Sequence, residues 1–488
     1  MTEQQKPTGH VGNLTKEEEE KLQELWTALF KVCGVVASEK PENDQKQEQQ
    51  NGNGEGATPS DTSTPDAKKP KKRLGFFSRK SESPSDSPSS DSVASSVAGM
   101  KLSDADDKYG ETREFLEALK DTSPEDIRLA FWSMVKHDHP DALLLRFLRA
   151  RKYDVNRALV MLVSAFRWRS QTMHLDDIMV KGDCFMEEES KSEDLAKKQE
   201  ASDFAKLLQL GESFIHSTDK AGRPICYIRV RLHRIGAHCE SSLERYTVYL
   251  IETSRLLLKS PVETAALVFD MTDFSLANMD YTPIKFMIKC FEANYPESLG
   301  IILVHKAPWI FSSIWAVIKG WLDPVVAAKV HFTKTPEDLE AVIPRNNLLK
   351  SLGGDDEYDY KYVEPIEGEN DKQWDTSRRD ELFKTRMEIA GAFQEATLAW
   401  IASKSDPTAK EEEKSSVKKT RTELAEKYCE NYWQLDPYIR ARSMYDRLGL
   451  IPPSKEDEAK ELSPTPQLSE KVNGDAVPVA AEQIAPAV

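Results

Sequence analysis

Cysteine is scarce in this chain, and its few residues follow no recognisable pattern. Six cysteines occur among 488 residues, with no Cys-x-x-Cys pair and no short disulfide framework: Cys33, Cys184, Cys226, Cys239, Cys290 and Cys429. Secreted domains stapled by disulfides have dense, regularly spaced cysteines. The sequence therefore favours a reducing compartment.

A long hydrophobic run is also missing. A helix that spans a bilayer needs about 20 mostly apolar residues, but the best candidate, over 300–322, is interrupted by Lys306, Pro308 and Lys319. The N-terminal MTEQQKPTGHVGNL has no apolar segment of the kind found in secretory signals. We expect a cytoplasmic protein.

Excess positive charge and the common enzyme motifs are absent as well. The formal net charge is −16, which argues against a nucleic-acid partner held by bulk electrostatics. There is no G-x-S-x-G elbow, P-loop or H-E-x-x-H. His137-Asp138-His139 precedes a helix, and Asp270 and Asp273 follow a strand, where turn formation is their commoner role. We expect no enzyme, no cofactor and no metal.

What is present divides the chain into seven segments. We predict a short N-terminal helix (1–36), a disordered basic and Ser-rich linker (37–107), a helical lobe (108–182), an acidic loop (183–207), an α/β domain (208–360), a C-terminal helical extension (361–451) and a disordered tail (452–488). In the helical segments, Ser123 and Asp154 are expected to cap helix starts, and one helix is expected to continue from 417 to 449.

The fold class predicted for 208–360 is α/β. Strand-like segments occupy 224–232, 265–271, 299–308 and 330–334, and helix-like segments occupy 241–259, 281–293, 308–322 and 324–329. Their alternation favours a mostly parallel sheet.

The predicted linker contains a basic run, KKPKKRLGFFSRK (68–80), followed by serines. Its simplest interpretation is a solvated linker. Lysines and arginines beside aromatic residues also suit an anionic membrane surface, from which phosphorylation would release them. A nuclear-import signal is a third interpretation.

The apolar stretch APWIFSSIWAVIKGWLDP (307–324) is richer in tryptophan than a surface helix needs to be. One helical face carries Phe311, Ile314, Trp315, Ile318, Trp321 and Leu322. Such a helix can pack on the sheet, or it can cover an apolar cavity and meet a bilayer, where indole rings are tolerated. The pattern leaves both readings open.

Three charged residues occupy positions that call for a partner. Arg151 shares a predicted apolar helix face with Phe147 and Leu148, so it needs an anion or the carbonyls of its own helix end. Lys329 directly precedes a strand, and Glu297 shortly precedes another. Two cations and a carboxylate would suit a phosphorylated polyol.

Four motifs, in order, resemble the CRAL-TRIO lipid-binding family, and within it the fungal phosphatidylinositol transfer proteins of the secretory type. They are LLRFLRARKYDVNRALVML, HSTDKAGRPICYIRV (entry to the first strand), NYPESLGIILVHKAPWIFSSIWAVIKGWLDPVVAAKV and IPRNNLLKSLGG. The similarity covers roughly 110–360. The segment YWQLDPYIRARSMYDRLG resembles an extension of fungal members.

The resemblance implies a helical N-terminal lobe and a mostly parallel sheet that floors a deep apolar lipid pocket, with C-terminal helices added. It places a gate helix on 307–322, and the headgroup positions on Arg151, Glu297 and Lys329. A family threonine is Val326 here. Where members that carry phosphatidylcholine have tyrosines, a serine and a threonine, this chain has Ile215, Cys226, Ala265 and Leu267.

From this resemblance we expect a phosphatidylinositol transfer protein in which phosphatidylcholine binding is lost or weakened. The sequence does not identify a second lipid ligand. We expect a monomer that meets membranes transiently, in the cytoplasm and at endomembranes such as endosome, microsome or lipid droplet. A carrier of a neutral sterol- or tocopherol-like lipid is one alternative. A membrane scaffold that presents lipid to partners is another, and deletion of 1–107 would abolish only the scaffold's activity.

Overall fold

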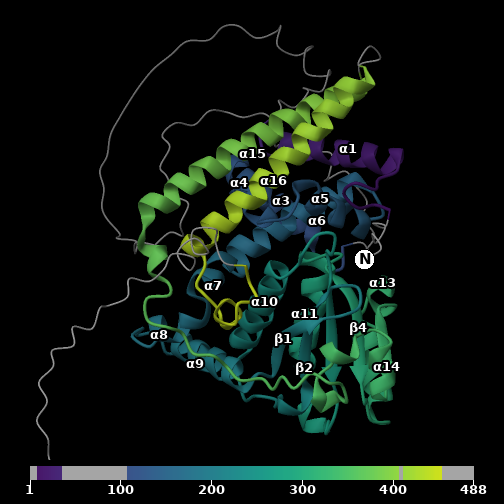
Figure 1. Ribbon diagram of the computed structural model, residues 1–488, viewed down its shortest axis with the longest axis vertical. Coiled ribbons are helices and arrows are strands. Elements are labelled where there is room, and N and C mark those ends of the chain that lie inside the picture. Colours follow the sequence, from purple (N-terminus) through teal and green to yellow (C-terminus); the bar gives the residue numbers. More distant parts are fainter. Residues whose placement is uncertain (1–7, 36–106, 406–409, 453–488) are drawn as a thin grey trace, which may run out of the picture.

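The computed structural model describes residues 8–35, 107–405 and 410–452 (Figure 1). The predicted linker and tail lie almost entirely outside these ranges, and the basic run over 68–80 lies wholly outside them. None of the helices in these ranges combines the length and hydropathy that crossing a bilayer requires.

The N-terminal part of the chain folds into a helical lobe. Its elements are α1 (Lys16–Val32), α3 (Glu111–Asp121), α4 (Pro124–Val135), α5 (Pro140–Ala150), α6 (Val155–Arg167) and the π-helical turn η2 (Trp168–Thr172). Ser123 and Asp154 accept hydrogen bonds from the backbone N–H three residues on, each at 3.0 Å, which confirms both predicted caps. The predicted apolar face of α1 is buried against α5 and α6.

The predicted acidic loop over 183–207 is wrong, because most of this segment is helical. After α7 (Leu175–Lys181) come η3 (Gly182–Cys184), α8 (Phe185–Glu189) and α9 (Leu195–Leu210). Asp194 caps α9 by accepting from Ala196 N at 3.0 Å. Phe204 and Leu207 are buried on one side of the helix. A few well-spaced apolar residues, dispersed among many charges, were enough to dock the helix.

Five strands form one sheet in sequence order. They are β1 (Ser213–Thr218), β2 (Pro224–Arg229), β3 (Ala265–Asp270), β4 (Leu299–His305) and β5 (Val330–Thr333). β1 is antiparallel to β2, and the other neighbours are parallel, as predicted. The sequence reading missed β1 and took β2 for the first strand, because β1 is a short, half-polar edge strand.

Helices and turns cover both faces of the sheet. One face packs against α10 (Glu240–Leu256), α11 (Tyr281–Lys289) with its π-helical continuation η6 (Cys290–Asn294), and α12 (Phe311–Lys319). The opposite face packs against α14 (Pro336–Glu340) and η8 (Lys350–Leu352). The remaining elements are α13 (Pro324–Ala327) and the 3₁₀ turns η4 (Val230–Leu232), η5 (Leu276–Asn278), η7 (Arg345–Asn347) and η9 (Asp371–Trp374).

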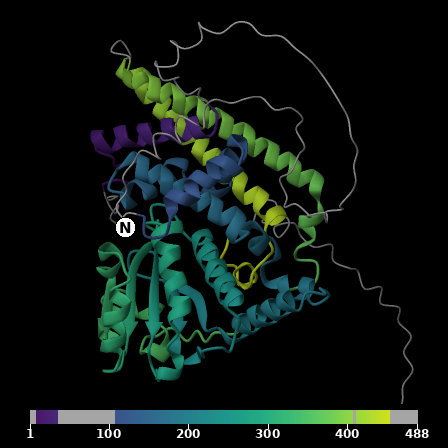
Figure 2. The ribbon, with the colours of Figure 1, turned by 180° about the vertical axis from the view of Figure 1, so that it is seen from behind.

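Two long C-terminal helices lie across the helical lobe. α15 (Thr376–Ser405) and α16 (Glu411–Ile439) run side by side over that lobe, on the side away from the sheet (Figures 1 and 2). The helix predicted over 417–449 ends instead at Ile439. Its last turn contains Pro437, and Arg440 is extended (φ −145°, ψ 136°) before the short helix α17 (Met444–Arg447).

Candidate functional site

A row of apolar side chains crosses the helix-covered face of the sheet. Ile215 pairs with Cys226, Cys226 with Leu267, Leu267 with Ile302, and Ile302 with Val330. All five belong to the same apolar core. The resemblance had singled out three of these positions, and the strand register brings them side by side.

The cavity above this row is small. It has a volume of about 70 Å³ and is lined by Cys226, Leu267, Leu250, Met287 and Phe291, among others. Ligand sites usually measure about 300–1,000 Å³. Side chains therefore fill most of the space where the resemblance implies a deep pocket, and a lipid could enter only if the covering helices moved.

The predicted gate residues lie at the edge of this core. Phe311, Ile314 and Ile318 are buried, and Trp315 meets Phe332 edge-on, with ring centroids 5.4 Å apart. α12 is shorter than the predicted 308–322. Trp321 and Leu322, which were expected on its apolar face, therefore follow the helix, but they still pack against the same core.

Contacts from α11 and η6 hold the segment that follows α12. Trp321 meets Tyr281 edge-on at 5.2 Å and lies 4.8 Å below the ammonium of Lys285. Glu292 accepts from Asp323 N at 2.7 Å, from Tyr109 at 2.7 Å and from Lys108 at 2.8 Å. The Glu292 carboxylate thus connects three parts of the chain: the segment 320–323 after α12, which we call the gate segment, the turn η6, and the start of the helical lobe.

Two of the three predicted headgroup residues lie together. Lys329 Nζ is 3.7 Å from Glu297 Oε2, and their side chains remain 21% and 28% exposed. They stand before β5 and β4, two adjacent parallel strands, and Lys329 directly precedes Val330 of the apolar row. Glu297 has a φ of +54°, a conformation uncommon for glutamate and enriched at functional sites.

Arg151 makes a different contact. It follows the end of α5 and donates to Glu111 Oε1 at 2.8 Å. Glu111 is buried, and its Oε2 has no hydrogen-bond partner among the described residues. Burial raises the pKa of Glu111, although the Arg151 charge opposes the shift. The guanidinium is therefore held by a carboxylate whose ionised form is poorly satisfied.

Sequence reasoning missed a buried charged cluster on α10. Glu252 is fully buried and contacts Lys136, Arg169 at 2.7 Å, Arg255 at 3.3 Å and the Tyr295 hydroxyl at 2.7 Å. Burial alone would raise the pKa of Glu252, but the three cations lower it well below its ordinary value. A lone glutamate within an otherwise apolar helix face was the only available signal.

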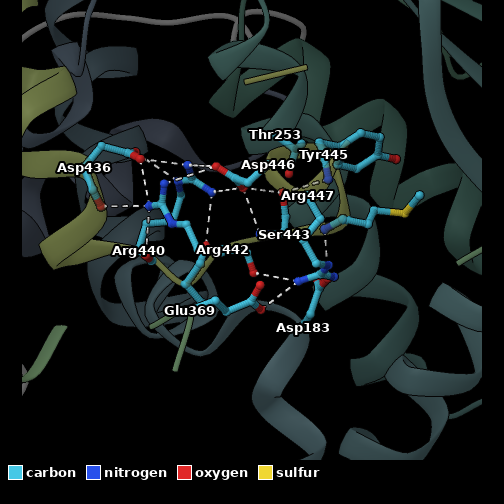
Figure 3. Close-up of polar contacts among 12 residues, drawn as sticks. Asp183, Thr253, Glu369, Asp436, Arg440, Arg442, Ser443, Tyr445, Asp446 and Arg447 are labelled. Carbon is cyan, nitrogen blue, oxygen red and sulfur yellow. Dashed lines mark hydrogen bonds and ion pairs between the residues drawn. The ribbon is translucent and has the colours of Figure 1, made fainter. Parts of the chain in front are cut away.

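A second missed cluster fastens the C-terminal segment to the turn η3 (Figure 3). We call it the C-terminal clamp: Asp183, Glu369, Asp436, Arg440, Arg442, Asp446 and Arg447. Arg440 donates to Asp436 and Asp446, each at 2.7 Å, and Arg447 donates to Glu369 at 2.8 Å and to Asp183. Alternating acidic and basic residues in the sequence were the signal.

The clamp brings the C-terminal segment to the floor of the sheet cavity. The Tyr445 hydroxyl accepts from Ile215 N at 3.0 Å, and Ile215 begins the apolar row. Met444 N donates to Asp183 at 3.1 Å. The packing of the C-terminal extension on the α/β domain, which the sequence left open, is thus direct.

The histidine cluster has structural contacts. His137 packs against the rings of Tyr432 and Trp433, Asp138 accepts from Arg146 at 3.0 Å, and His139 caps α5. In the part of the chain that the structure describes, His, Cys, Asp and Glu form no group of three that could hold a metal ion.

Comparison with known proteins finds relatives over nearly the whole chain. Two family models match, "CRAL/TRIO domain" over 208–354 and "CRAL/TRIO, N-terminal domain" over 111–164. The chain is 40% identical to CRAL-TRIO domain-containing protein C3H8.02 of Schizosaccharomyces pombe, covering 96% of each chain. It is 38% identical to Phosphatidylinositol transfer protein CSR1 of Eremothecium gossypii, covering 92% of this chain and all of that protein.

A solved structure, "Crystal structure of Sfh5", matches 55% of this chain and 96% of its own, with a TM-score of 0.37 and 16% identity. The family assignment rests on the models and on the two long alignments, whose matched ranges contain both the helical lobe and the five-stranded sheet. This chain belongs to the CRAL-TRIO family.

Proposed function

We propose that this chain is a phosphatidylinositol transfer protein that extracts one phospholipid from a membrane and carries it in a gated apolar pocket to another. The observation that carries the proposal is the partly exposed Lys329–Glu297 pair beside the end of the apolar row. A cation suits the phosphate and a carboxylate suits the inositol hydroxyls. The name of the Eremothecium gossypii relative supports the same ligand.

Arg151 is the third headgroup residue of the proposal. Its side chain is 22% exposed and bound to Glu111, whose burial disfavours the ionised form. A lipid phosphate keeps its negative charge at neutral pH and could replace that carboxylate. Binding would then exchange one anion for another at Arg151, without leaving the cation unpaired.

The proposed pocket is gated by α12 and the segment after it. Opening requires the contacts of Trp321 and Glu292 to break, because the closed cavity is only about 70 Å³. Burying acyl chains contributes about 0.8 kcal/mol per CH₂, which offsets the cost of leaving the bilayer. The proposal contains no covalent step.

Loss or weakening of phosphatidylcholine binding belongs to the same proposal. Cys226, Ala265 and Leu267 line the sheet cavity, and Ile215 is the strand neighbour of Cys226; none of these four side chains has a hydroxyl to offer a choline phosphate. Burial raises the pKa of the Cys226 thiol to about 12, so this side chain stays neutral. The same apolar row favours the second candidate function, a carrier of a neutral lipid.

We further propose that the protein acts as a monomer and associates peripherally with endomembranes. Trp309, 87% exposed directly before α12, suits a brief contact with the membrane interface.

Mass spectrometry of the lipid that co-purifies with the full chain tests the ligand. We expect phosphatidylinositol in the wild type and its loss in Arg151→Ala combined with Lys329→Ala. Lys334→Ala, an exposed lysine after the same strand, is the matched control and should retain the lipid. A neutral isoprenoid bound equally by all three proteins would favour the second candidate, and phosphatidylcholine would contradict the headgroup assignment.

A further inference from the structure

A second, much larger cavity lies between the helical lobe and the C-terminal helices. Its volume is about 740 Å³, within the usual range of about 300–1,000 Å³ for small-molecule sites. Residues of α4, α6, α7, α15 and α16 line it, and it shares no lining residue with the sheet cavity. It is therefore separate from the site of the proposed function.

Most of its wall is apolar. The lining includes Ile127, Trp132, Phe166, Met179, Phe383 and Leu435. Trp374 also lines the cavity and is 81% exposed, so an indole ring stands where the cavity meets solvent. An apolar interior behind a tryptophan suits a ligand that arrives from a membrane interface.

The inner end carries an arginine with no carboxylate. Arg386 is buried and donates to three neutral oxygens: Lys136 O at 2.6 Å, Tyr428 O at 3.1 Å and Asn431 Oδ1 at 3.5 Å. Its guanidinium stacks 3.6 Å from the Tyr428 ring centroid. Among the described residues, no acidic side chain pairs with it. A buried guanidinium that has no carboxylate partner is strongly stabilised when an anion binds beside it.

Neighbouring charges reinforce this polarity. Lys136 and Arg169 also line the cavity, and both pair with the one buried carboxylate of Glu252, which Arg255 contacts as well. Four carboxylates also line the cavity, but they are exposed to solvent, whereas Lys136, Arg169 and Arg386 are buried; the four are Asp121, Asp126, Asp176 and Glu188. The cavity combines apolar walls with an excess of positive charge at one end.

We propose that this cavity binds one single-chain anionic lipid. Its acyl chain would lie against the apolar walls, and its acid group, a carboxylate or a phosphate, would pair with Arg386 beside Lys136 and Arg169. The lipid would bridge the helical lobe and the C-terminal helices, so its binding would stabilise their association.

Calorimetric titration of the full chain with oleate, oleoyl lysophosphatidic acid and oleyl alcohol tests the chemistry. Saturable binding of either acid, with oleyl alcohol at least about tenfold weaker, supports the proposal, because the three probes share one chain and differ in charge. The acid that binds more tightly identifies the preferred head group, a carboxylate for oleate or a phosphate for oleoyl lysophosphatidic acid. Equal binding of oleyl alcohol would overturn the role of Arg386.

Variants assign the place of binding. Ser133 lines the cavity and is exposed, so Ser133→Trp fills the space without disturbing a buried contact. We expect it to abolish probe binding, and Arg386→Gln to weaken binding roughly ten- to hundredfold. Ser416→Trp, at an exposed position of α16 outside the cavity, is the matched control and should bind normally.

Lys329→Ala separates this site from the proposed headgroup site. Undiminished oleate binding by Lys329→Ala, with normal phosphatidylinositol transfer by Ser133→Trp, would establish two independent sites. Unchanged probe binding in Ser133→Trp, or displacement of the probe by phosphatidylinositol, would overturn the proposal. If instead the wild type transferred no phosphatidylinositol, only the proposed function would fail.

Discussion

The charges at the sheet edge and those of the C-terminal clamp are arranged differently. Lys329 and Glu297 are 3.7 Å apart and partly exposed, whereas Arg440 and Asp436 are 2.7 Å apart and almost completely buried. Every charge of the clamp has its partner within the protein, while the sheet-edge pair has donors and acceptors to spare. The clamp charges are thus paired within the protein, whereas the sheet-edge pair is free to contact a ligand, as the proposed function requires.

Breaking the clamp should have the largest effect on stability. Asp436→Asn leaves the buried Arg440 and the partly buried Arg442 with one carboxylate fewer, and loss of a buried partner costs about 3–5 kcal/mol. Urea unfolding would measure this change. Glu381→Gln, which removes an exposed ion pair with Arg378, should cost less than about 1 kcal/mol. Equal losses in the two variants would contradict the comparison.

Breaking the sheet-edge pair should affect transfer rather than stability. Lys329→Ala removes one charge-assisted contact to the proposed phosphate, and we expect transfer between vesicles to fall roughly ten- to hundredfold. Its unfolding free energy should change by less than about 1 kcal/mol, because the pair is long and partly exposed. Strong destabilisation with transfer intact would assign Lys329 to the architecture.

Glu292 is intermediate between the buried clamp and the partly exposed sheet-edge pair, because its carboxylate is buried and holds the gate segment. Glu292→Gln keeps the side chain's shape but weakens its contacts with Lys108 and Asp323 N. Losing about 1 kcal/mol from the closed form should open the gate about fivefold more often. Hydrogen exchange of α12 would report it, with Glu297→Gln as the comparison. Slower exchange of α12 would contradict the assigned role.

The smallest expected effect concerns pH. Burial raises the pKa of Glu111 in the folded protein above its value near 4.5 in the unfolded chain. At pH values above the raised pKa, ionised Glu111 lowers the free energy of unfolding. This loss is relieved as the pH falls through the raised pKa toward the unfolded one. Protonation would also free Arg151 for phosphate. Phosphatidylinositol binding should therefore strengthen, by less than about tenfold, on going from pH 7.5 to 5.5.

Glu111→Gln removes the titrating group and is the control for this effect. The pH dependence should flatten in that variant, with affinity close to the wild-type value at low pH. An unchanged pH profile would show that Arg151 does not depend on Glu111.

Local pattern was enough to predict most elements of the fold. The strands β2 to β5 and the caps at Ser123 and Asp154 follow from side-chain periodicity and capping chemistry, which act over a few residues. β1 and α9 were missed because one is a half-polar edge strand and the other has few apolar residues among many charges. The end of α16 was missed because the pairing of Asp436 with Arg440 and Arg442 favours an extended exit.

For the candidate site, the sequence identified the residues but not which side chains they contact. Glu297 and Lys329 were singled out and do meet, since adjacent parallel strands bring their amino ends together. Arg151 was singled out too, but its contact with Glu111 depends on how packing against α6 brings the start of α3 to the end of α5. For the Glu252 cluster, the lone glutamate on α10 was a local signal, but its partners Lys136 and Arg169 come from distant segments.

By itself the sequence determined most of the helices, the parallel strands, the apolar face of α12 and, through its motifs, the family. Only the tertiary structure decided that Tyr445 meets Ile215 across 230 positions, that Glu292 holds the gate segment, and that the large cavity lies beside Arg386. The reason is the distance along the chain over which the interactions act. Backbone propensity and periodicity act between near neighbours, whereas contacts between distant residues are selected by the packing of the whole chain.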